Sequence, residues 1–444
     1  MKGPGFINII PLPYTPLKKT EKALEVIQRH SKETSWPEGV VPMAPEHDGN
    51  EGFWPRGFAT ASVAAGIKYS GRTDLMALLA EHDCTAAGVF TTNLCCAAPV
   101  HVSKKHLEMS SAAMRAIVCN SGNANAATGD QGMRDAISMA ESAARAFAIP
   151  AESVIVSSTG VIGQTLPLDR VRAGISNLLP LCNTESGLLP AQAIMTTDTF
   201  PKFFFVDVIL SGGTVRISGI AKGSGMICPN MATMLAFMAT DASIEPALLQ
   251  EALREANSHS FNAITVDGDT STNDMAVILA GGTGPQVVKG SNDERLFKEA
   301  LGALMEFLAR LIVIDGEGAS KLVTITVEGA ENDHEATLAA RTIAQSSLVK
   351  TALHGEDANW GRVIAAAGRS GARFHEEDLE LFFNDLPVLR QNLNAEFSEE
   401  EAAEILAKQS YVITLKIGSG SGKATVWTCD LSKEYIEING SYRS

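Results

Sequence analysis

Three observations predict a layered α/β fold for this sequence. The chain has 444 residues, more than the roughly 250 to 300 at which a single hydrophobic core stops growing, so two or three packed units are expected. Hydrophobic residues make up 45% of the chain and charged residues 20%, which is the profile of a globular protein. Strand-like and helix-like segments alternate through a body dense in Ala, Gly, Val and Ile, as they do in layered α/β structures.

Charge and cysteine content exclude several classes of protein. The chain has 36 Lys and Arg against 51 Asp and Glu, a formal net charge of -15, which disfavours phosphate backbones and anionic lipid surfaces as partners. The seven cysteines form no C-x-x-C pair, which argues against a disulfide framework or a zinc site. No apolar run reaches the roughly 18 residues of a spanning helix, and no signal peptide is recognised. We therefore expect a cytoplasmic protein that binds neither nucleic acid nor membranes.

Residues 1–35 are expected to form an arm ahead of the body. They carry six Lys or Arg and three Glu, with Pro11, Pro13 and Pro16 near their start. A transit peptide would share the basic residues but lack the acidic ones, so an accessory arm is the favoured interpretation. A Pro- and Gly-rich stretch from Trp36 to Arg56 then leads into the body.

Within the body, several predicted elements end at polar loops. Gly88–Phe90 and Ile117–Asn120 each have the character of a strand end, and small polar residues follow both, a pattern common at active sites. Apolar residues at helical spacing predict a helix over Arg295–Ile312. The pattern then breaks and leaves Glu317 on a glycine-flanked loop before an alternating strand, Leu322–Val327.

The C-terminal part predicts a β-hairpin. Tyr411–Ile417 and Ala424–Cys429 have strand character, and the glycine-rich Gly418–Gly422 between them is a hairpin signal. A third short strand is expected within a few residues of the end of the sequence.

Four familiar motifs are incomplete. Gly418–Lys423 lacks the spacer and the hydroxyl of a phosphate loop. Asp267, Asp269 and Asp274 lack the glycine and the glutamate that complete a calcium loop. The nine histidines show no zinc-protease spacing, and the nearest approach to a nucleophile elbow, Gly368–Ala372, ends in Ala. A nucleotide-binding loop, a metalloenzyme and a Ser-His-Asp hydrolase are thus disfavoured.

The segment from Ala221 to Leu235 is the most informative one. A glycine-bearing loop with Lys222 runs into Pro229-Asn230 and then into a mostly apolar stretch around Thr233. By pattern alone this is a loop that enters a buried strand, with Thr233 packed in the core.

This segment, Lys222-Gly-Ser-Gly-Met226 followed by Pro229-Asn-Met-Ala-Thr-Met-Leu235, closely resembles the self-processing segment of ornithine acetyltransferases, also called bifunctional glutamate N-acetyltransferases. Further blocks of that family follow in the family's order between about Pro37 and Ser444. They are Asn120-Ser-Gly-Asn-Ala-Asn125, Ser158-Thr-Gly160, Met195-Thr-Thr-Asp-Thr199, Thr265-Val-Asp-Gly-Asp-Thr-Ser-Thr-Asn-Asp274, Asp315-Gly-Glu-Gly-Ala319, Gly355-Glu-Asp-Ala-Asn-Trp-Gly-Arg362 and Thr428-Cys-Asp-Leu431.

The sequence departs from the family in few places. The N-terminal arm is longer than usual, Cys228 belongs to no family block, and the chain ends in Ser444 where the family tends to have Thr. Ser444 keeps the hydroxyl, so the departure puts little in doubt.

The resemblance implies that Thr233 first cleaves the chain and then acts as the catalytic nucleophile. Cleavage of the Ala232–Thr233 bond would give an α chain, 36–232 after the arm, and a β chain, 233–444. A threonine hydroxyl needs an adjacent base, and the amine freed by cleavage can serve as one. The implied fold is an α/β/β/α sandwich shared by both products, with a smaller C-terminal α/β unit from about residue 335, and the cleaved chains would assemble as α2β2.

The resemblance also implies a reaction. An acetyl group would pass from N2-acetylornithine to Thr233 and then to glutamate, with no cofactor or metal. The bifunctional enzyme, which takes acetyl-CoA as a further donor, is favoured over the monofunctional one, and the sequence alone does not separate the two. Thr159 and Gly160 would stabilise the oxyanion of each tetrahedral intermediate. Lys222 suits the substrate carboxylate, and Glu317 suits the side-chain ammonium of ornithine. The full set of implied substrate-binding residues is Thr196, Lys222, Thr233, Glu317, Asn439 and Ser444.

Two other interpretations stay open at this point. A related self-processing N-terminal-nucleophile amidohydrolase or aminopeptidase would use water or a peptide in place of glutamate, but Glu317 and the Asn439–Ser444 end favour the transferase. A non-enzymatic binding protein would have no need of the Ala232–Thr233 junction.

Overall fold

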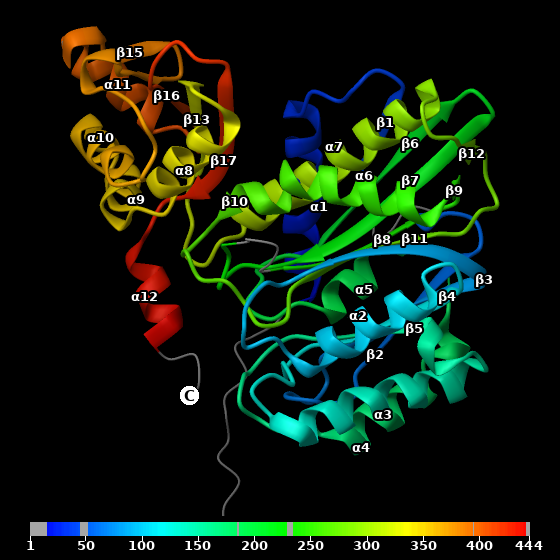
Figure 1. Cartoon of the computed structure of the whole chain (residues 1–444). Coiled ribbons are helices and arrows are strands. Elements are labelled where there is room, and N and C mark those ends of the chain that lie inside the picture. Colours follow the sequence, from blue (N-terminus) through cyan, green and yellow to red (C-terminus); the bar gives the residue numbers. More distant parts are fainter. Residues whose placement is uncertain (1–15, 45–51, 184–185, 229–233, 394, 441–444) are drawn as a thin grey trace, which may run out of the picture.

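The described part of the chain forms two units, each built on its own β-sheet (Figure 1). The computed structural model describes residues 16–44, 52–183, 186–228, 234–393 and 395–440. The larger unit has a nine-stranded sheet and the smaller, C-terminal unit a six-stranded sheet. A separate two-stranded sheet consists of β9 (Ser243–Ile244) and β12 (Gln286–Val287). The predicted layered α/β fold is thus confirmed.

The larger sheet has the strand order β1, β6, β7, β8, β11, β3, β4, β5, and β2 also pairs with β3. Its strands are β1 (Val40–Met43), β2 (Phe58–Val63), β3 (Leu75–Phe90), β4 (Met114–Asn120), β5 (Val154–Ser158), β6 (Lys202–Leu210), β7 (Gly213–Lys222), β8 (Leu235–Thr240) and β11 (Met275–Ala280). The strand ends predicted at Phe90 and Asn120 are confirmed.

The long strand β3 links two layers of this sheet. Its first half, Leu75–Ala80, pairs with β2 and β4, whereas its second half, Thr85–Phe90, pairs with β11. Between the halves the residues 81–83 are exposed, and the register with β4 shifts. Two sheet layers therefore lie face to face, and helices cover the outer side of each (Figure 1). This is the α/β/β/α sandwich that the family resemblance implied.

Side chains of the layer β3–β4–β5 alternate between two cores, because successive residues of a strand point to opposite faces. Met76 and Leu78 belong to the core between the layers, whereas Leu75 and Ala77 belong to the core under the outer helices. These helices are α2 (Ala98–Ser110), α3 (Gly129–Phe147) and α4 (Leu168–Ser176). The short helix α5 (Leu188–Ala193) contacts strands of both layers.

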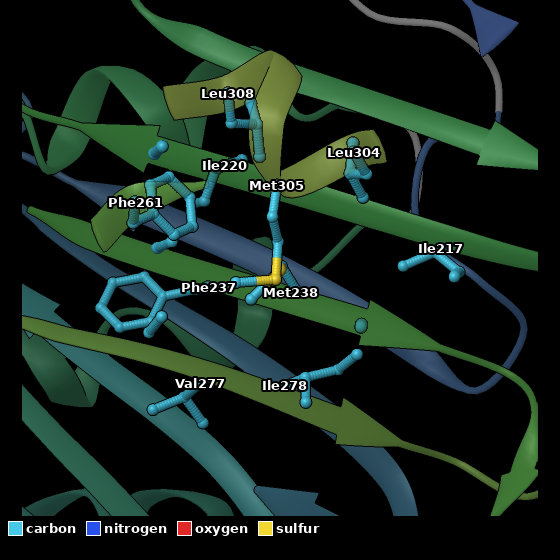
Figure 2. Close-up of a cluster of buried hydrophobic side chains, with 14 of the residues drawn as sticks. Ile217, Ile220, Phe237, Met238, Phe261, Val277, Ile278, Leu304, Met305 and Leu308 are labelled. Carbon is cyan, nitrogen blue, oxygen red and sulfur yellow. The ribbon is translucent and has the colours of Figure 1, made fainter. Parts of the chain in front are cut away.

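Helices α6 (Pro246–Ser258) and α7 (Asn292–Ile314) cover the opposite face. The helix predicted at Arg295–Ile312 is confirmed as α7, and it begins where Ser291 Oγ accepts the N–H of Glu294 at 3.1 Å. Leu304, Met305 and Leu308 lie on its sheet-facing side, over the strands that carry Ile220 and Met238 (Figure 2). Each such fully buried side chain contributes about 1.5 to 3 kcal/mol to folding.

The C-terminal unit has a core of its own, which runs from Val323 to Val426. Its sheet has the order β10, β17, β13, β16, β14, β15. The strands are β10 (Ile264–Thr265), β13 (Leu322–Ala330), β14 (Glu380–Phe383), β15 (Leu386–Leu389), β16 (Ser410–Lys416) and β17 (Gly422–Cys429). The helices are α8 (Asp333–Ala344), α9 (Ser347–His354), α10 (Trp360–Gly368) and α11 (Glu399–Leu406).

The predicted hairpin of β16 and β17 is wrong. Both strands exist, but β13 lies between them, parallel to β16 and antiparallel to β17. The glycine-rich link crosses the end of β13, where Ile417 N donates to Glu328 O and Gly420 N donates to Gly329 O, each at 2.9 Å. The strand Leu322–Val327 predicted from its alternating pattern is β13 itself, which lies at an interior position of the sheet.

The expected third strand near the C-terminus is also wrong. Residues Lys433–Gly440 form helix α12, and none of the side chains of this helix is buried in a core. β17 already pairs with β13 and β10, so no sheet edge is free beside it. At the other end, part of the N-terminal arm is helix α1 (Pro16–Glu33), which buries Ala23, Ile27 and His30 against the larger unit. No helix among the described residues has the length and apolar character needed to cross a membrane.

Candidate active site

One pocket of about 360 Å³ collects most of the predicted site residues. Its lining includes six of them, which come from segments far apart in the sequence: Thr159, Gly160, Thr196, Lys222, Glu317 and Asn439. Ala232, Thr233 and Ser444 lie outside the described residues. Met234, the residue that follows Thr233, also lines the pocket. Residues proposed from separate short motifs thus meet at one place.

Thr159 and Gly160 form the turn directly after β5. Gly160 has a φ of +135°, and a Cβ atom at this position would lie 2.3 Å from the carbonyl carbon of Gly122, so the turn requires glycine. The backbone N–H of Thr159 donates to Asn120 O at 2.9 Å, which fixes the position of the turn. The Thr159 hydroxyl forms no hydrogen bond with the described residues. It is therefore available to a ligand.

Buried asparagines hold the loops around this turn. Asn120 Nδ2 donates to Asn123 O at 2.9 Å, and Asn120 Oδ1 accepts the hydroxyl of Ser158 at 2.6 Å. Asn273, just before β11, donates through Nδ2 to Ser158 O at 2.8 Å and to Ala124 O at 2.5 Å. The family blocks contain these asparagines, but the sequence alone assigned them no role. In the structure they fix the loops after β4 and β5 against the start of β11.

Lys222 is the last residue of β7 and is only 8% exposed. Its Nζ donates to Oγ1 of Thr196 at 3.0 Å. In the sheet it lies opposite Leu235, the first residue of β8 and the second residue after Thr233 in the sequence. Among the described residues that line the pocket, Lys222 is the one cation.

Glu317 lies on the predicted glycine-flanked loop, between α7 and β13, and is 6% exposed. Asn439 of α12 donates through Nδ2 to Glu317 Oε2 at 2.7 Å. Gly225 faces the same carboxylate so closely that a Cβ atom there would lie 2.4 Å from the Glu317 Cδ atom. The carboxylate is therefore held between the loop after β7 and the C-terminal helix.

The loop before the predicted cleavage site is held by Asp267. Its carboxylate accepts the backbone N–H groups of Met226 at 2.6 Å and of Ile227 at 2.8 Å. Tyr435 of α12 donates its hydroxyl to the same carboxylate at 3.4 Å. Burial raises the pKa of Tyr435, and the nearby carboxylates of Asp267 and Glu317 raise it further, so this phenol stays protonated. Asp267, rejected above as a calcium ligand, acts as a cap for this loop.

Three charged residues behind the pocket were not predicted as part of the site. The Nζ atom of Lys202 lies 2.8 Å from Asp198 Oδ1 and 2.6 Å from Asp315 Oδ2, and all three side chains are buried. Asp198 and Asp315 stand inside family blocks, two residues after Thr196 and two before Glu317. This closeness in sequence to Thr196 and Glu317 was the signal that could have placed the two aspartates at the site. Lys202 stands outside the blocks and could be found only from the structure.

The pocket can bind an amino acid by its charges. Lys222 offers a cation for a carboxylate, and Glu317 offers an anion for an ammonium group. The Thr159 hydroxyl is a donor suited to a developing oxyanion. Within the described ranges, no cluster of three or more His, Cys, Asp or Glu side chains could hold a metal ion.

Comparison with known proteins identifies the family of the chain. A model of the ArgJ family matches residues 59–444. The arginine biosynthesis bifunctional protein ArgJ of Chlorobium chlorochromatii is 64% identical over 428 residues, which are 96% of this chain and 100% of that protein. The protein of the same name from Chlorobaculum tepidum is 61% identical over 392 residues, which are 88% of this chain and 97% of that protein. The crystal structure of arginine biosynthesis bifunctional protein ArgJ from Bacillus halodurans has 43% identity and a TM-score of 0.46, over 47% of this chain and 100% of that one. The chain belongs to the ArgJ family.

Proposed function

We propose that this enzyme transfers an acetyl group from N2-acetylornithine to glutamate through an acetyl ester of Thr233. Its relatives at 64% and 61% identity are arginine biosynthesis proteins by name, and the chain is an acetyltransferase of that pathway. One observation carries the assignment of the site. Six residues expected to bind substrate or stabilise an oxyanion line a single pocket, together with Met234.

Self-cleavage prepares the nucleophile. The Thr233 hydroxyl attacks the carbonyl carbon of Ala232, the peptide C–N bond breaks, and an ester joins Ala232 to Thr233 Oγ1. Water hydrolyses this ester, which frees the carboxylate of Ala232, the hydroxyl of Thr233 and a new α-amine. That amine is the base that the hydroxyl requires.

Acetyl transfer then takes two steps. Thr233 Oγ1 attacks the acetyl carbon of N2-acetylornithine, the amide C–N bond breaks, and the α-amine of ornithine leaves after it takes up a proton. The α-amine of glutamate attacks the acetyl-Thr233 ester, the C–O bond breaks, and N-acetylglutamate leaves with the hydroxyl restored. Each tetrahedral intermediate carries an oxyanion, which the Thr159 hydroxyl and the Gly160 N–H would stabilise.

The charged residues orient the substrates. Lys222 binds the α-carboxylate that acetylornithine and glutamate share, with Thr196 beside it. Glu317 binds the side-chain ammonium of ornithine, and Asn439 holds the Glu317 carboxylate in place. Ser444 is a further substrate-binding residue of the proposal. The acetyl group arrives on the donor, so the reaction needs no resident cofactor, and acetyl-CoA would act as a second donor.

The sheet itself supports a stable complex of the two cleavage products. β6 and β7 precede the Ala232–Thr233 bond, whereas β8 and β11 follow it, and β3 precedes it again. These strands are neighbours in one sheet, in the order β6, β7, β8, β11, β3. Both products would thus stay joined by strand pairing, and two such pairs would form the α2β2 assembly. A cytoplasmic location is part of the proposal, and the seven cysteines, all with free thiols, support a reducing compartment.

Two donors assayed side by side test the transfer reaction. Acetyl-labelled N2-acetylornithine and acetyl-CoA are each incubated with the enzyme, with and without glutamate. Label in N-acetylglutamate from acetylornithine is the expected result, and label from acetyl-CoA as well would show the bifunctional form. Release of free acetate without transfer would assign the chain to the amidohydrolases instead.

Self-cleavage has its own test. The purified protein is expected to run as two fragments of 232 and 212 residues on a denaturing gel, and the smaller fragment should begin Thr-Met-Leu-Ala-Phe. The Thr233→Ala variant should stay intact. A variant that is still cut at the same bond would show that a contaminating protease made the cut.

A further inference from the structure

The walls of the pocket are joined behind it by one buried ion network. Lys202, at the start of β6, is fully buried, and its Nζ atom contacts Asp198 Oδ1 at 2.8 Å and Asp315 Oδ2 at 2.6 Å. Asp198 lies on the loop that carries Thr196, and Asp315 lies on the loop that carries Glu317. On the basis of the proposed function, we propose that Lys202 is a positioning residue that sets Lys222 and Glu317 for substrate binding.

The Asp198 branch reaches both residues that would bind the substrate carboxylate. Asp198 Oδ2 accepts the N–H of Thr196 at 2.9 Å, and Asp198 Oδ1 accepts the N–H of Gly223, next to Lys222, at 2.8 Å. Thr196 and Lys222 are in turn joined at 3.0 Å. A movement of the Asp198 carboxylate would therefore displace both.

The Asp315 branch reaches the carboxylate that would bind the ornithine ammonium. The backbone carbonyl of Asp315 accepts the hydroxyl of Ser224 at 2.6 Å, and the carbonyl of Ser224 accepts the N–H of Glu317 at 3.0 Å. The Asp315 carboxylate also accepts the N–H and the hydroxyl of Thr199. Lys202 thus fixes the base of the Glu317 loop through Asp315.

The charge of Lys202 affects the position of Lys222 as well as the stability of the fold. Burial alone would raise the pKa of Asp198, but the charges of Lys202 and Lys222 lower it below its ordinary value, so Asp198 is ionised. Without Lys202, the two buried carboxylates of Asp198 and Asp315 would lose the cation that they share. Lys222 would then be the remaining lysine whose charge acts on Asp198. An uncompensated buried charge is costly. We expect the Lys222 ammonium to move toward Asp198 and away from the substrate carboxylate.

The test compares Lys202→Met with Arg216→Met. Arg216 of β7 forms a two-pronged ion pair at 2.7 and 2.8 Å with Asp207, which lies on β6 five positions after Lys202. Neither residue lines the pocket. In Lys202→Met, KM for acetylornithine and for glutamate should rise roughly 10- to 100-fold, with a smaller change in kcat. In Arg216→Met, both KM values should stay at the wild-type level even if the melting temperature falls.

A second variant separates positioning from simple loss of stability. In Lys202→Met/Asp198→Asn, no carboxylate at position 198 attracts Lys222, so part of the lost affinity for both substrates should return. A merely structural lysine predicts no recovery, since the double variant removes a further buried contact. The double variant also removes the buried negative charge of Asp198, which keeps the test available if the single variant does not fold.

Crystal structures decide the point without an activity assay. The Lys222 Nζ atom should leave Thr196 Oγ1 for Asp198 in Lys202→Met and stay near Thr196 in Arg216→Met. An unmoved Lys222 together with unchanged KM values would overturn the proposal. If the wild-type enzyme itself moved no acetyl group, the proposed function would fail, and the position of Lys222 in these crystals would still show whether Lys202 sets it.

Discussion

Asn439 donates through Nδ2 to Glu317 Oε2 at 2.7 Å, and this bond joins the C-terminal helix to the pocket across 122 positions of sequence. The same amide also donates to Tyr435 O at 3.0 Å, one helical turn earlier. Because α12 buries none of its own residues, polar contacts of this kind hold it beside the pocket. The Glu317 carboxylate is therefore positioned by groups that do not neutralise its charge.

Glu317→Gln removes the negative charge and keeps an amide oxygen for Asn439. If Glu317 binds the ornithine ammonium, KM for acetylornithine should rise roughly 10- to 100-fold, since a buried charge pair is lost. Glutamate carries no side-chain ammonium, so its KM should change much less. Steady-state kinetics with each substrate varied in turn measure the difference. Equal effects on the two substrates would remove Glu317 from this role.

Lys222→Ala should weaken the two substrates alike, because they share the α-carboxylate. We expect both KM values to rise roughly 10- to 100-fold. The matched control is Lys298→Ala, which removes a lysine of α7 that pairs with Glu251 and Glu294 outside the pocket. That variant should keep wild-type KM values. A Lys222→Ala effect on only one substrate would contradict the shared binding of the carboxylate.

The site shows what short motifs can predict and where they stop. Thr196, Lys222 and Glu317 stand in ordered blocks, and the structure brings them to one pocket. Lys202 was missed, because an isolated lysine has no local pattern and its two partners come from loops more than one hundred residues apart. Buried ion networks depend on tertiary contacts that sequence spacing does not encode.

Strand pairing shows the same limit. The individual strands β13, β16 and β17 follow from local alternation, and each is present. Their order in the sheet does not follow from local pattern. Closeness along the sequence favoured a direct hairpin of β16 and β17, but in the structure β13 lies between them and pairs with both. The short strand expected near the end of the sequence fails for the same reason, because β17 has no free neighbouring edge and residues Lys433–Gly440 are helical.

We expect acid to destabilise the docking of the N-terminal helix α1, because this helix buries His30 in its neutral form. This side chain stacks on Phe307 with ring centroids 5.1 Å apart, and its Nε2 atom is buried without a partner among the described residues. Burial, together with the nearby charges of Arg310 and Arg29, lowers the pKa of His30 from 6.5 to about 3. The docked histidine is therefore neutral, whereas the undocked one takes up a proton below about pH 6.5.

Because the unfolded state binds more protons in this range, the contribution of His30 to stability is complete above about pH 6.5 and is lost as the pH falls toward 3. At pH 5 the loss should amount to about 2 kcal/mol. Thermal unfolding at pH 7.5 and pH 5 measures it. His30→Phe keeps the stacked ring without the titration, so its melting temperature should fall less between the two pH values. An equal fall in both proteins would assign the acid sensitivity to other groups.

Thr159 tests the oxyanion site without a change to the nucleophile. Its hydroxyl lines the pocket and forms no hydrogen bond with the described residues, and its backbone is fixed by the 2.9 Å bond from Thr159 N to Asn120 O. Thr159→Ala should therefore leave the turn and the bound substrate in place and remove one donor to the developing negative charge.

The expected result for Thr159→Ala is a fall in kcat of roughly 100- to 1000-fold with little change in KM, since the donor acts mainly in the transition state. Thr159→Ser keeps the hydroxyl and should retain most of the activity, which controls for the loss of side-chain volume. Self-cleavage should also slow in the Ala variant, because attack on the Ala232 carbonyl forms a tetrahedral oxyanion too. Both variants are assayed as correctly cleaved protein, so that the transfer step is measured alone. Full acetyl transfer by cleaved Thr159→Ala would show that another group stabilises the oxyanion and that Thr159 only shapes the turn after β5.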